Sequence, residues 1–364
     1  MKLTEDFRNP ELAAALVESI NRKSKKPVRL MEFCGSHTMA IFKFGIRQIV
    51  PPTVEMLSGP GCPVCVSANA DIDKAIAMAK LPGIILCTFG DMLKVPGSDG
   101  SLQQARAEGG DVRVVYSTMD AMEICRRNPE KEVIFLGVGF ETTAPGIAAS
   151  VMLAADEGIK NYSLFCLAKL CPPVMKALLD AGEVELDGII CPGHVSAIIG
   201  SQSYDFIPRD YGIACVVAGF EPLDVLQATD MLITQIEAGR PTVEIAYRRG
   251  VDRQGNIRAQ ELMQRVFEIR PAIWRGIGEV AGSGLKLAGK YSRYDAEIKH
   301  PVKTCKTREP EGCLCGYVLR GTKKPTDCAL FRGVCTPDKP VGPCMVSNEG
   351  ACSTYYLYGD ENDG

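Results

Sequence analysis

The pair Cys62 and Cys65 has the C-x-x-C spacing of a redox-active or metal-binding site. It comes just before a predicted helix that opens near Ser67 to Asp71, and the backbone amides at a helix start favour thiolate. Such a pair forms a reversible disulfide or holds a metal together with a third ligand. The alternative is two small apolar side chains in a tight turn, although a Gly-Cys-Pro turn is an awkward place to bury sulfur.

Cys34 and His37 share the turn Cys-Gly-Ser-His-Thr, which suits a nucleophile and its base, or a soft metal ligand beside a polar group. A Cys-His hydrolase also needs an orienting Asn or Asp and an oxyanion site, which the sequence does not reveal. His194 either takes part in chemistry or shapes its loop by hydrogen bonding. Glu141, followed by two threonines, is a proton carrier or an anchor for its loop. His300 is expected at the surface.

Six cysteines occur in a C-terminal stretch that is rich in Gly and Pro and lacks helical or alternating periodicity. Such a segment buries too little apolar surface to hold one shape without a covalent or metal staple. Zinc ribbons use paired C-x-x-C knuckles. The spacings here are irregular, which favours a [4Fe–4S] cluster held by scattered loops. Spacing alone does not choose four ligands from Cys313, Cys315, Cys328, Cys335, Cys344 and Cys352.

Composition and charge narrow the class of protein. The N-terminus lacks the pattern of a secretory signal, and no stretch approaches the roughly 18 apolar residues of a membrane span. We therefore expect a cytoplasmic protein with no membrane partner, whose 16 cysteines indicate metal or redox chemistry rather than structural disulfides. A net charge of −3 without a long basic run, and a single Trp, give no footprint for nucleic acid.

Eight short apolar runs separated by helical stretches predict an α/β fold. Near-continuous apolar strands between helices are typical of a parallel sheet covered on both faces. A single closed barrel is the alternative to the arrangement we expect, in which two Rossmann-like parallel-sheet domains face a central cleft. The expected domains are residues 1–125, residues 126–300 and a small cysteine-rich iron–sulfur domain at 301–364. The apolar runs are 28–33, 53–57, 83–89, 112–116, 133–140, 162–168, 187–193 and 214–220.

The candidate residues follow five of these strands directly. In open α/β sheets, ligands bind beyond the carboxyl ends of the strands. The five polar turns at these ends are therefore expected to line one cleft between the facing sheets. Further along the chain, EPLDVLQATDMLITQIEAG and ELMQRVFEI predict helices and VEIAYRR predicts a strand. The polar turns are 34–38, 59–65, 139–145, 191–196 and 219–222.

Seven motifs occur in order along the chain: CGSHT (34–38), GPGCPVC (59–65), GFETTAP (139–145), PGHVSAIIG (192–200), GFEPLD (219–224), CGYVLRG (315–321) and CMVSNEGAC (344–352). Together they resemble the HypD family of hydrogenase maturation factors, and the resemblance spans essentially the whole chain. It implies two α/β domains and a terminal domain that holds a [4Fe–4S] cluster. The family's ligand spacing, C-x14-C-x6-C-x16-C, falls here on Cys313, Cys328, Cys335 and Cys352. One departure is Ala168, because a His is expected before Lys169.

The resemblance implies a scaffold for metallocentre assembly rather than a conventional turnover enzyme. With a HypC-like small chaperone, such a protein carries the iron on which the Fe(CN)2CO unit of [NiFe]-hydrogenase is assembled. A HypE-like protein supplies cyanide, and the hydrogenase large subunit is an indirect partner. Cys34 corresponds to the iron-holding cysteine, and Cys62 and Cys65 correspond to the redox-active pair.

This picture has a chemical logic, and two alternatives stay open beside it. Ligand attachment to iron needs electrons, which a cluster reached through Cys62 and Cys65 delivers, and proton transfer, for which His37, His194 and Glu141 are candidates. The first alternative is an iron–sulfur thiol–disulfide oxidoreductase that acts on a protein disulfide. The second is a zinc-stapled binding protein without redox chemistry.

Overall fold

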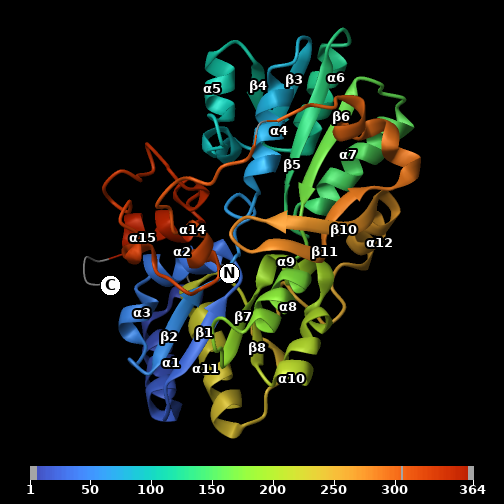
Figure 1. Ribbon diagram of the computed structural model, residues 1–364. Coiled ribbons are helices and arrows are strands. Elements are labelled where there is room, and N and C mark those ends of the chain that lie inside the picture. The colour runs from blue at the N-terminus through green and yellow to red at the C-terminus, as the bar shows by residue number, and fades with distance from the viewer. Residues whose placement is uncertain (1–5, 305, 360–364) are drawn as a thin grey trace.

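The computed structural model describes residues 6–304 and 306–359, and its ribbon shows two separate sheets with helices around them (Figure 1). All eight apolar runs form strands, as predicted. The first sheet is five-stranded and parallel, in the order β2-β1-β7-β8-β9, where β9 is the strand expected in VEIAYRR. Its strands are β1 (Val28–Glu32), β2 (Val54–Ser58), β7 (Gly188–Pro192), β8 (Ala214–Ala218) and β9 (Val243–Ile245).

The second sheet is four-stranded and parallel, in the order β4-β3-β5-β6. Every residue of β3 and β6 is buried, as expected for strands covered on both faces. The expectation of two parallel-sheet units is thereby confirmed, and the barrel alternative is wrong. The strands are β3 (Ile84–Thr88), β4 (Asp111–Val114), β5 (Glu132–Gly139) and β6 (Tyr162–Ala168).

Strands do not divide between the sheets at residue 125/126, where a domain boundary was expected. The chain leaves the first sheet after β2, builds all of the second sheet, and returns to the first at β7. The expected boundary falls near the end of α6 (Thr118–Arg127), just before a turn. That turn leads into β5, which pairs with β3 in the same sheet, so the connection is an ordinary crossover.

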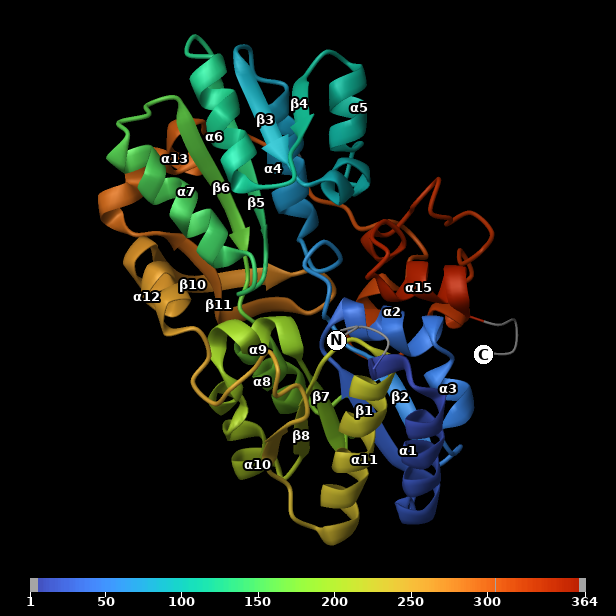
Figure 2. The same cartoon turned by 180° about the vertical axis from the view of Figure 1, so that it is seen from behind.

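Helices cover both faces of both sheets, as the side-chain packing shows. On the first sheet, Ile190 and Val216 pack with α1, α2 and α11, whereas Ile189 and Cys215 point to the opposite face, toward α8 and α10. On the second sheet, α6 and α7 cover one face and α4 and α5 cover the other (Figure 2). The bounds are α1 (Pro10–Lys23), α2 (Gly35–Lys43), α3 (Ile46–Ile49), α4 (Asn69–Ala79), α5 (Leu102–Ala107), α7 (Ala144–Asp156), α8 (Cys171–Ala181), α9 (Gly193–Ile199), α10 (Phe206–Tyr211) and α11 (Pro222–Ala238).

An antiparallel hairpin that the sequence did not predict lies between the two sheets (Figure 1). The predicted helix ELMQRVFEI ends early: α12 (Ile257–Val266) stops before Phe267, and β10 (Phe267–Trp274) begins there. β10 pairs with β11 (Gly278–Leu287), and Trp274 is fully buried with its indole Nε1 donating to Ser283 Oγ at 2.8 Å. Isolated β-bridges pair the hairpin with Ser67, which follows the first sheet's β2, and with Lys169, which follows the second sheet's β6. The hairpin therefore contacts segments that extend from both sheets.

The C-terminal segment packs against the first sheet's α2 (Figure 2). The ring of Phe42 in α2 packs against that of Tyr355 in a tilted arrangement, with the ring centroids 4.2 Å apart. The hydroxyl of Tyr355 accepts a hydrogen bond from Arg47 at 2.9 Å. Among the described helices, none is long and apolar enough to cross a membrane. The remaining helices and turns are short: η1 (Asp6–Arg8), η2 (Gly90–Lys94), η3 (Ser201–Tyr204), η4 (Gly289–Tyr294), α13 (Ala296–Lys299), α14 (Cys315–Leu319), η5 (Pro325–Asp327), η6 (Pro343–Met345) and α15 (Ala351–Tyr358).

Replacement of Gly61 by alanine is expected to destabilise the protein. A Cβ at Gly61 would lie 2.3 Å from the backbone nitrogen of Cys34, so one of the two loops must shift, at a cost of about 1–3 kcal/mol. Gly146→Ala in α7 is the matched control, because a Cβ there meets nothing within 4 Å and alanine favours a helix. Urea unfolding tests this expectation, and equal midpoints for the two variants would contradict it.

Candidate functional site

Cys34 lies where β1 gives way to α2, at the carboxyl end of a central strand. Its backbone N–H donates to Glu32 Oε2 at 2.8 Å, and its side chain is only 8% exposed. Burial raises the pKa of the thiol to about 12, and the carboxyl groups of Glu349 and Glu32 add to the shift. The free thiol is therefore protonated at neutral pH, and a bound metal ion is needed to hold it as thiolate.

Glu32 is a buried carboxyl that the sequence analysis did not single out. One oxygen accepts the Cys34 N–H, and the other accepts the hydroxyl of Thr38. Burial outweighs these hydrogen bonds and raises the pKa of Glu32 to about 8. A carboxyl beside Cys34 thus changes its protonation state near neutral pH.

A cavity of about 530 Å³ opens beside Cys34, and it joins the polar turns of both sheets. The expected central cleft is thereby confirmed, and it receives residues from four of the five predicted turns. GFEPLD, the fifth turn, contributes indirectly, through Phe220 packed behind the wall. The lining residues that come from the predicted turns are Cys34, Ser36, Gly61, Pro63, Phe140, Thr142, Thr143, Pro192, Gly193, His194 and Val195.

His37 and His194 are brought together, but in different roles. They stack on Phe220 with ring centroids 4.8 Å and 3.8 Å away. His37 is fully buried, its Nε2 lies 2.9 Å from the carbonyl oxygen of Gly219, and burial lowers its pKa to about 4, so it is neutral. It joins α2 to the loop after β8 and does not line the cleft. His194 does line the cleft, and partial burial lowers its pKa.

Glu349, from the C-terminal segment, reaches the same cleft. The hydroxyl of Ser36 donates to its Oε1, and its backbone carbonyl fills the space in which a Cβ of Gly35 would stand. A carboxyl from the cysteine-rich segment therefore lies beside the Cys34 turn. The sequence carried a signal for it, because Glu349 lies within the motif CMVSNEGAC, but nothing in that motif indicated which turn it would contact.

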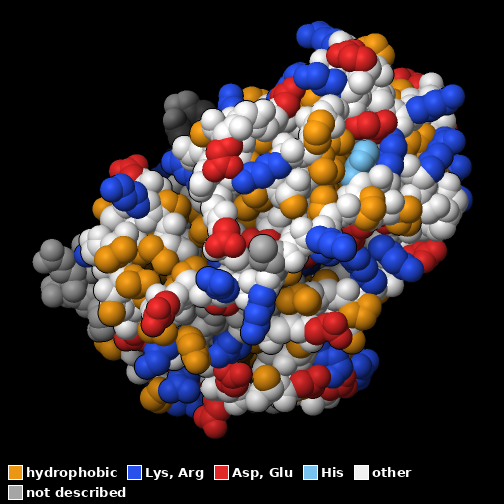
Figure 3. All heavy atoms as spheres, turned by 45° about the horizontal axis from the view of Figure 1, so that its top comes forward, with side chains coloured by type: hydrophobic (Ala, Val, Ile, Leu, Met, Phe, Trp, Pro, Cys, Tyr) orange, Lys and Arg blue, Asp and Glu red, His pale blue; other side chains and the backbone are white. Residues whose placement is uncertain are grey.

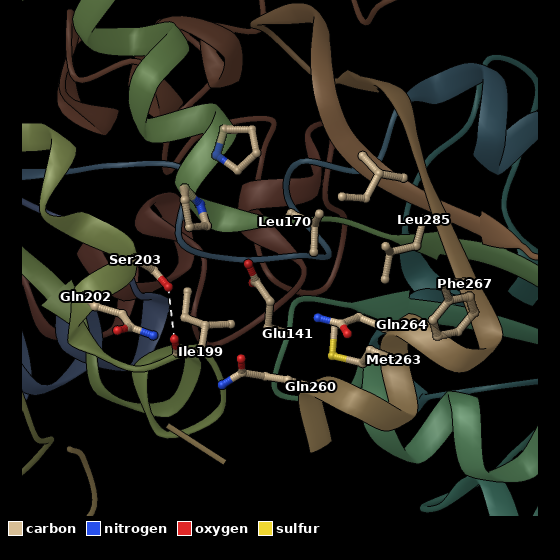
Figure 4. Close-up of a pocket in the computed structure, with 13 residues that line it drawn as sticks. Glu141, Leu170, Ile199, Gln202, Ser203, Gln260, Met263, Gln264, Phe267 and Leu285 are labelled. Atoms are coloured by element: carbon tan, nitrogen blue, oxygen red, sulfur yellow. Dashed lines mark hydrogen bonds between the residues drawn. The ribbon is translucent and has the colours of Figure 1, made fainter. Parts of the chain in front are cut away.

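Glu141 is not brought together with Cys34. The neighbouring Phe140 and Thr142 line the cleft, but the Glu141 side chain turns away into a second cavity of about 430 Å³ (Figure 4). Its Oε1 accepts the backbone N–H of Cys171 at 2.9 Å, and burial raises its pKa to about 7. Oε2 has no hydrogen-bond partner among the described residues. Of its two expected roles, that of loop anchor has structural support.

Cys62 and Cys65 are buried behind the cleft, with exposed fractions of 3% and 0%. The Cys65 N–H donates to Cys62 Sγ at 3.3 Å, so the two sulfur atoms lie on one turn. This turn precedes α4, which begins at Asn69, close to the predicted start. Burial raises the pKa of the Cys65 thiol well above its usual value, which opposes rather than favours thiolate.

The six C-terminal cysteines line one small cavity together. Cys315 and Cys344, which spacing could not assign, have sulfur atoms 2.7 Å apart, and Cys344 also contacts the thiols of Cys65 and Cys352. A Cβ at Gly342 would lie 2.7 Å from Cys313 Sγ, so glycine is required beside the sulfur atoms. No group of three or more His, Cys, Asp or Glu in the described residues is arranged around a single metal ion.

The side chains that line this cavity include the donor type that a [4Fe–4S] cluster requires. Thiolates are the ligands of such clusters. Cys313, Cys328 and Cys335 come from loops and Cys352 from the start of α15, and all four line the same space. Cys315 and Cys344 remain as two further thiols, and Cys344 lies next to Cys65. The cysteine cavity and the Cys62–Cys65 turn are thus neighbours, although the two lie far apart in the sequence.

These features define an α/β protein with one cysteine on the wall of an inter-sheet cleft and a buried dithiol next to a cysteine-lined cavity. The HypD family model, described as "Hydrogenase formation hypA family", matches residues 11–359. Hydrogenase maturation factor HypD2 of Bradyrhizobium diazoefficiens is 47% identical over 100% of this chain and 98% of its own. HypD of Rhodobacter capsulatus is 47% identical and HypD of Escherichia coli 42%, over 99% and 98% of this chain and 98% of each relative.

The chain therefore belongs to the HypD family, which confirms the resemblance inferred from its motifs.

Replacement of Glu32 by glutamine is expected to change how stability depends on pH. The folded-state pKa of Glu32, about 8, exceeds the unfolded value of 4.5, so the folded protein binds the extra proton between these values. Glu32 therefore lowers stability as the pH rises from about 5 to 8, by up to roughly 1.4 kcal/mol per pH unit. Glu32→Gln removes this contribution, and urea unfolding at pH 5, 6, 7 and 8 measures it. Parallel profiles for the two proteins would contradict the assignment.

Proposed function

We propose that this protein acts in [NiFe]-hydrogenase maturation, as a scaffold that holds iron at Cys34 while the Fe(CN)2CO unit is assembled. The observation that carries the proposal is the position of Cys34 on the wall of a sheltered cleft, with the Cys62–Cys65 turn directly behind it. The match to the HypD family supports hydrogenase maturation as the pathway. A cargo iron that carries cyanide and carbonyl needs a soft thiolate and protection from water. Cys34 supplies the thiolate, and the cleft around it supplies the protection.

Cys34 loses its proton when the cargo iron binds, because a coordinated thiol is deprotonated. Glu32 does not take up this proton, because burial raises its pKa to about 8 and it already carries a proton at neutral pH. The proton that Cys34 releases therefore leaves through the cleft. His194 is the one of the three expected proton carriers that lines the cleft, so we assign proton transfer during ligand attachment to it. His37 positions the loops instead.

Cys62 and Cys65 form the redox partner of this site. Oxidation of the two thiols to one disulfide releases two electrons and two protons, so the pair exchanges two electrons per cycle. Cys313, Cys328, Cys335 and Cys352 would hold a [4Fe–4S] cluster, which when bound supplies one-electron chemistry. Cys344 lies between the pair and this cavity, in contact with Cys65.

The partners follow from the same picture. A HypC-like chaperone shares the cargo iron at the mouth of the cleft, and a HypE-like protein delivers cyanide there, with the hydrogenase large subunit downstream. The surface fits protein partners rather than nucleic acid, because acidic and basic side chains are interspersed over the face in Figure 3.

Burial argues against an independent thiol–disulfide oxidoreductase, the alternative that the sequence left open. Such an enzyme must present a sulfur atom to a disulfide of another protein, and thiol exchange requires direct access. Cys62 and Cys65 are almost completely covered. The dithiol is placed for internal electron exchange.

The double variant Cys62→Ser/Cys65→Ser is expected to keep the visible absorbance of the cluster but to lose the infrared bands of iron-bound cyanide and CO. The measurement is made on anaerobically purified protein in complex with its HypC-like partner. Cys34→Ser should also lose these bands, because the cargo has lost its thiolate. Cys87→Ser, in the core of the second sheet, is the control and should retain them. Normal bands in the double variant would refute a redox role for the pair.

Single replacement of Cys313, Cys328, Cys335 or Cys352 by alanine is expected to abolish the brown colour and the cluster iron after anaerobic reconstitution. Each replacement removes one of four proposed ligands. Cys315→Ala and Cys344→Ala serve as matched variants from the same cavity and should keep the colour. Iron and zinc analysis with visible spectroscopy checks this. Zinc without iron in the wild-type protein would overturn the assignment.

A further inference from the structure

A fourth cavity, of about 210 Å³, lies between the carboxyl end of β6, helix α4 and the β10–β11 hairpin. It shares no residue with the cleft at Cys34 or with the cysteine cavity. Charged side chains from three elements converge on it: Asp71 and Lys74 from α4, Lys169 from the end of β6, and Arg270 and Glu279 from the hairpin, with Glu297 of α13 beside them.

Lys169 is the most deeply buried charged residue of this cavity. Its side chain is only 3% exposed, and its ammonium group donates to the carbonyl oxygen of Ile273 at 3.0 Å and lies 5.8 Å from the ring of Trp274. In the part of the chain that the structure describes, no carboxylate forms an ion pair with it. Burial lowers the pKa of Lys169, and the carboxyl of Asp71 opposes this shift without a direct ion pair. A buried cation without a directly bonded anion is costly. One carbonyl oxygen satisfies only one of its three donors.

The other two cations of the cavity share a single carboxylate. Lys74 contacts Glu297 at 2.7 Å and Arg270 contacts it at 3.3 Å, so one negative charge serves two positive ones. The second guanidinium nitrogen of Arg270 donates to the carbonyl oxygen of Cys166. Glu297 is therefore fully engaged and cannot also neutralise Lys169.

Two carboxyl groups remain, and neither pairs with Lys169 directly. Glu279 is exposed at the rim. Asp71 is partly buried, and burial raises its pKa, while the charges of Lys169 and Lys74 oppose this shift. Only the protonated form of this carboxyl can donate a hydrogen bond to an acceptor in the cavity. Lys169 and Asp71 thus form two sides of a space that an acceptor with negative charge fits.

We propose that this cavity binds a small oxyanion, with Lys169 as its principal cationic ligand and with Arg270 and Lys74 adding positive charge at the wall. Its volume suits an ion of the size of phosphate or bicarbonate rather than a nucleotide. The site is independent of the cargo iron and of the cluster, so it stands or falls apart from the proposed function. It lies beside α4, the helix that follows the Cys62–Cys65 turn.

Titration of the full-length, anaerobically purified protein with inorganic phosphate, and separately with bicarbonate, tests the proposal. The ionic strength is held constant with sodium chloride, and thermal unfolding and calorimetric heat are recorded. We expect a saturable rise of the unfolding midpoint for at least one of the two anions. Lys169→Met should weaken the apparent affinity at least tenfold, and Lys169→Arg should retain most of it.

Lys94→Met is the matched control, since Lys94 is an exposed residue outside this cavity and loses the same charge. It should titrate like the wild type. In the absence of added anion, Lys169→Met should be as stable as the wild type or more stable. The reason is that an apolar side chain replaces a buried amine that has no direct ion pair. Equal affinity in Lys169→Met and Lys94→Met, or no saturable response to either anion in the wild type, overturns the proposal.

Discussion

Close backbone contact at Cys34 is the constraint on which the site depends. Gly61 lies against the Cys34 nitrogen, and Gly35 lies against the backbone of Glu349, with no room for a Cβ at either place. Three segments meet here: the strand that ends at Cys34, the turn that carries the dithiol, and the C-terminal segment. Because these contacts involve the backbone, the three segments cannot separate without a shift of the main chain. The cleft, the dithiol and the cysteine cavity hold their relation through this junction.

Burial controls the electrostatics of this junction. It raises the pKa values of Cys34, Cys65 and Glu32, so the resting site is protonated and close to neutral. A cation that bound to these groups would displace protons, so its affinity would depend on pH. His37 is neutral for the same reason, and its hydrogen bond to the loop after β8 makes it part of the framework.

Much of the fold was visible in the sequence because buried parallel strands are continuous apolar runs. Each of the eight apolar runs forms one of the strands β1 to β8, and the polar residues after them indicated the cleft. The hairpin was missed because FEIRPAIW follows a helical pattern without a turn signal, and Pro271 argued against a strand. Strand order was also beyond reach: local pattern does not say which strands pair. Glu32 could not be found because a carboxyl inside an apolar run gives no sign that its oxygens accept from Cys34 and Thr38.

The excursion of the chain into the second sheet and back sets an order for synthesis. On the ribosome, β1 and β2 emerge first but lack β7, the neighbour that completes their pairing, until the whole second sheet has been made. The second sheet is continuous in sequence and can fold as soon as β6 has emerged. The half that carries Cys34 therefore matures last, when the C-terminal segment brings Glu349 onto it. A nascent chain cannot complete the junction at Cys34 before Glu349 has emerged.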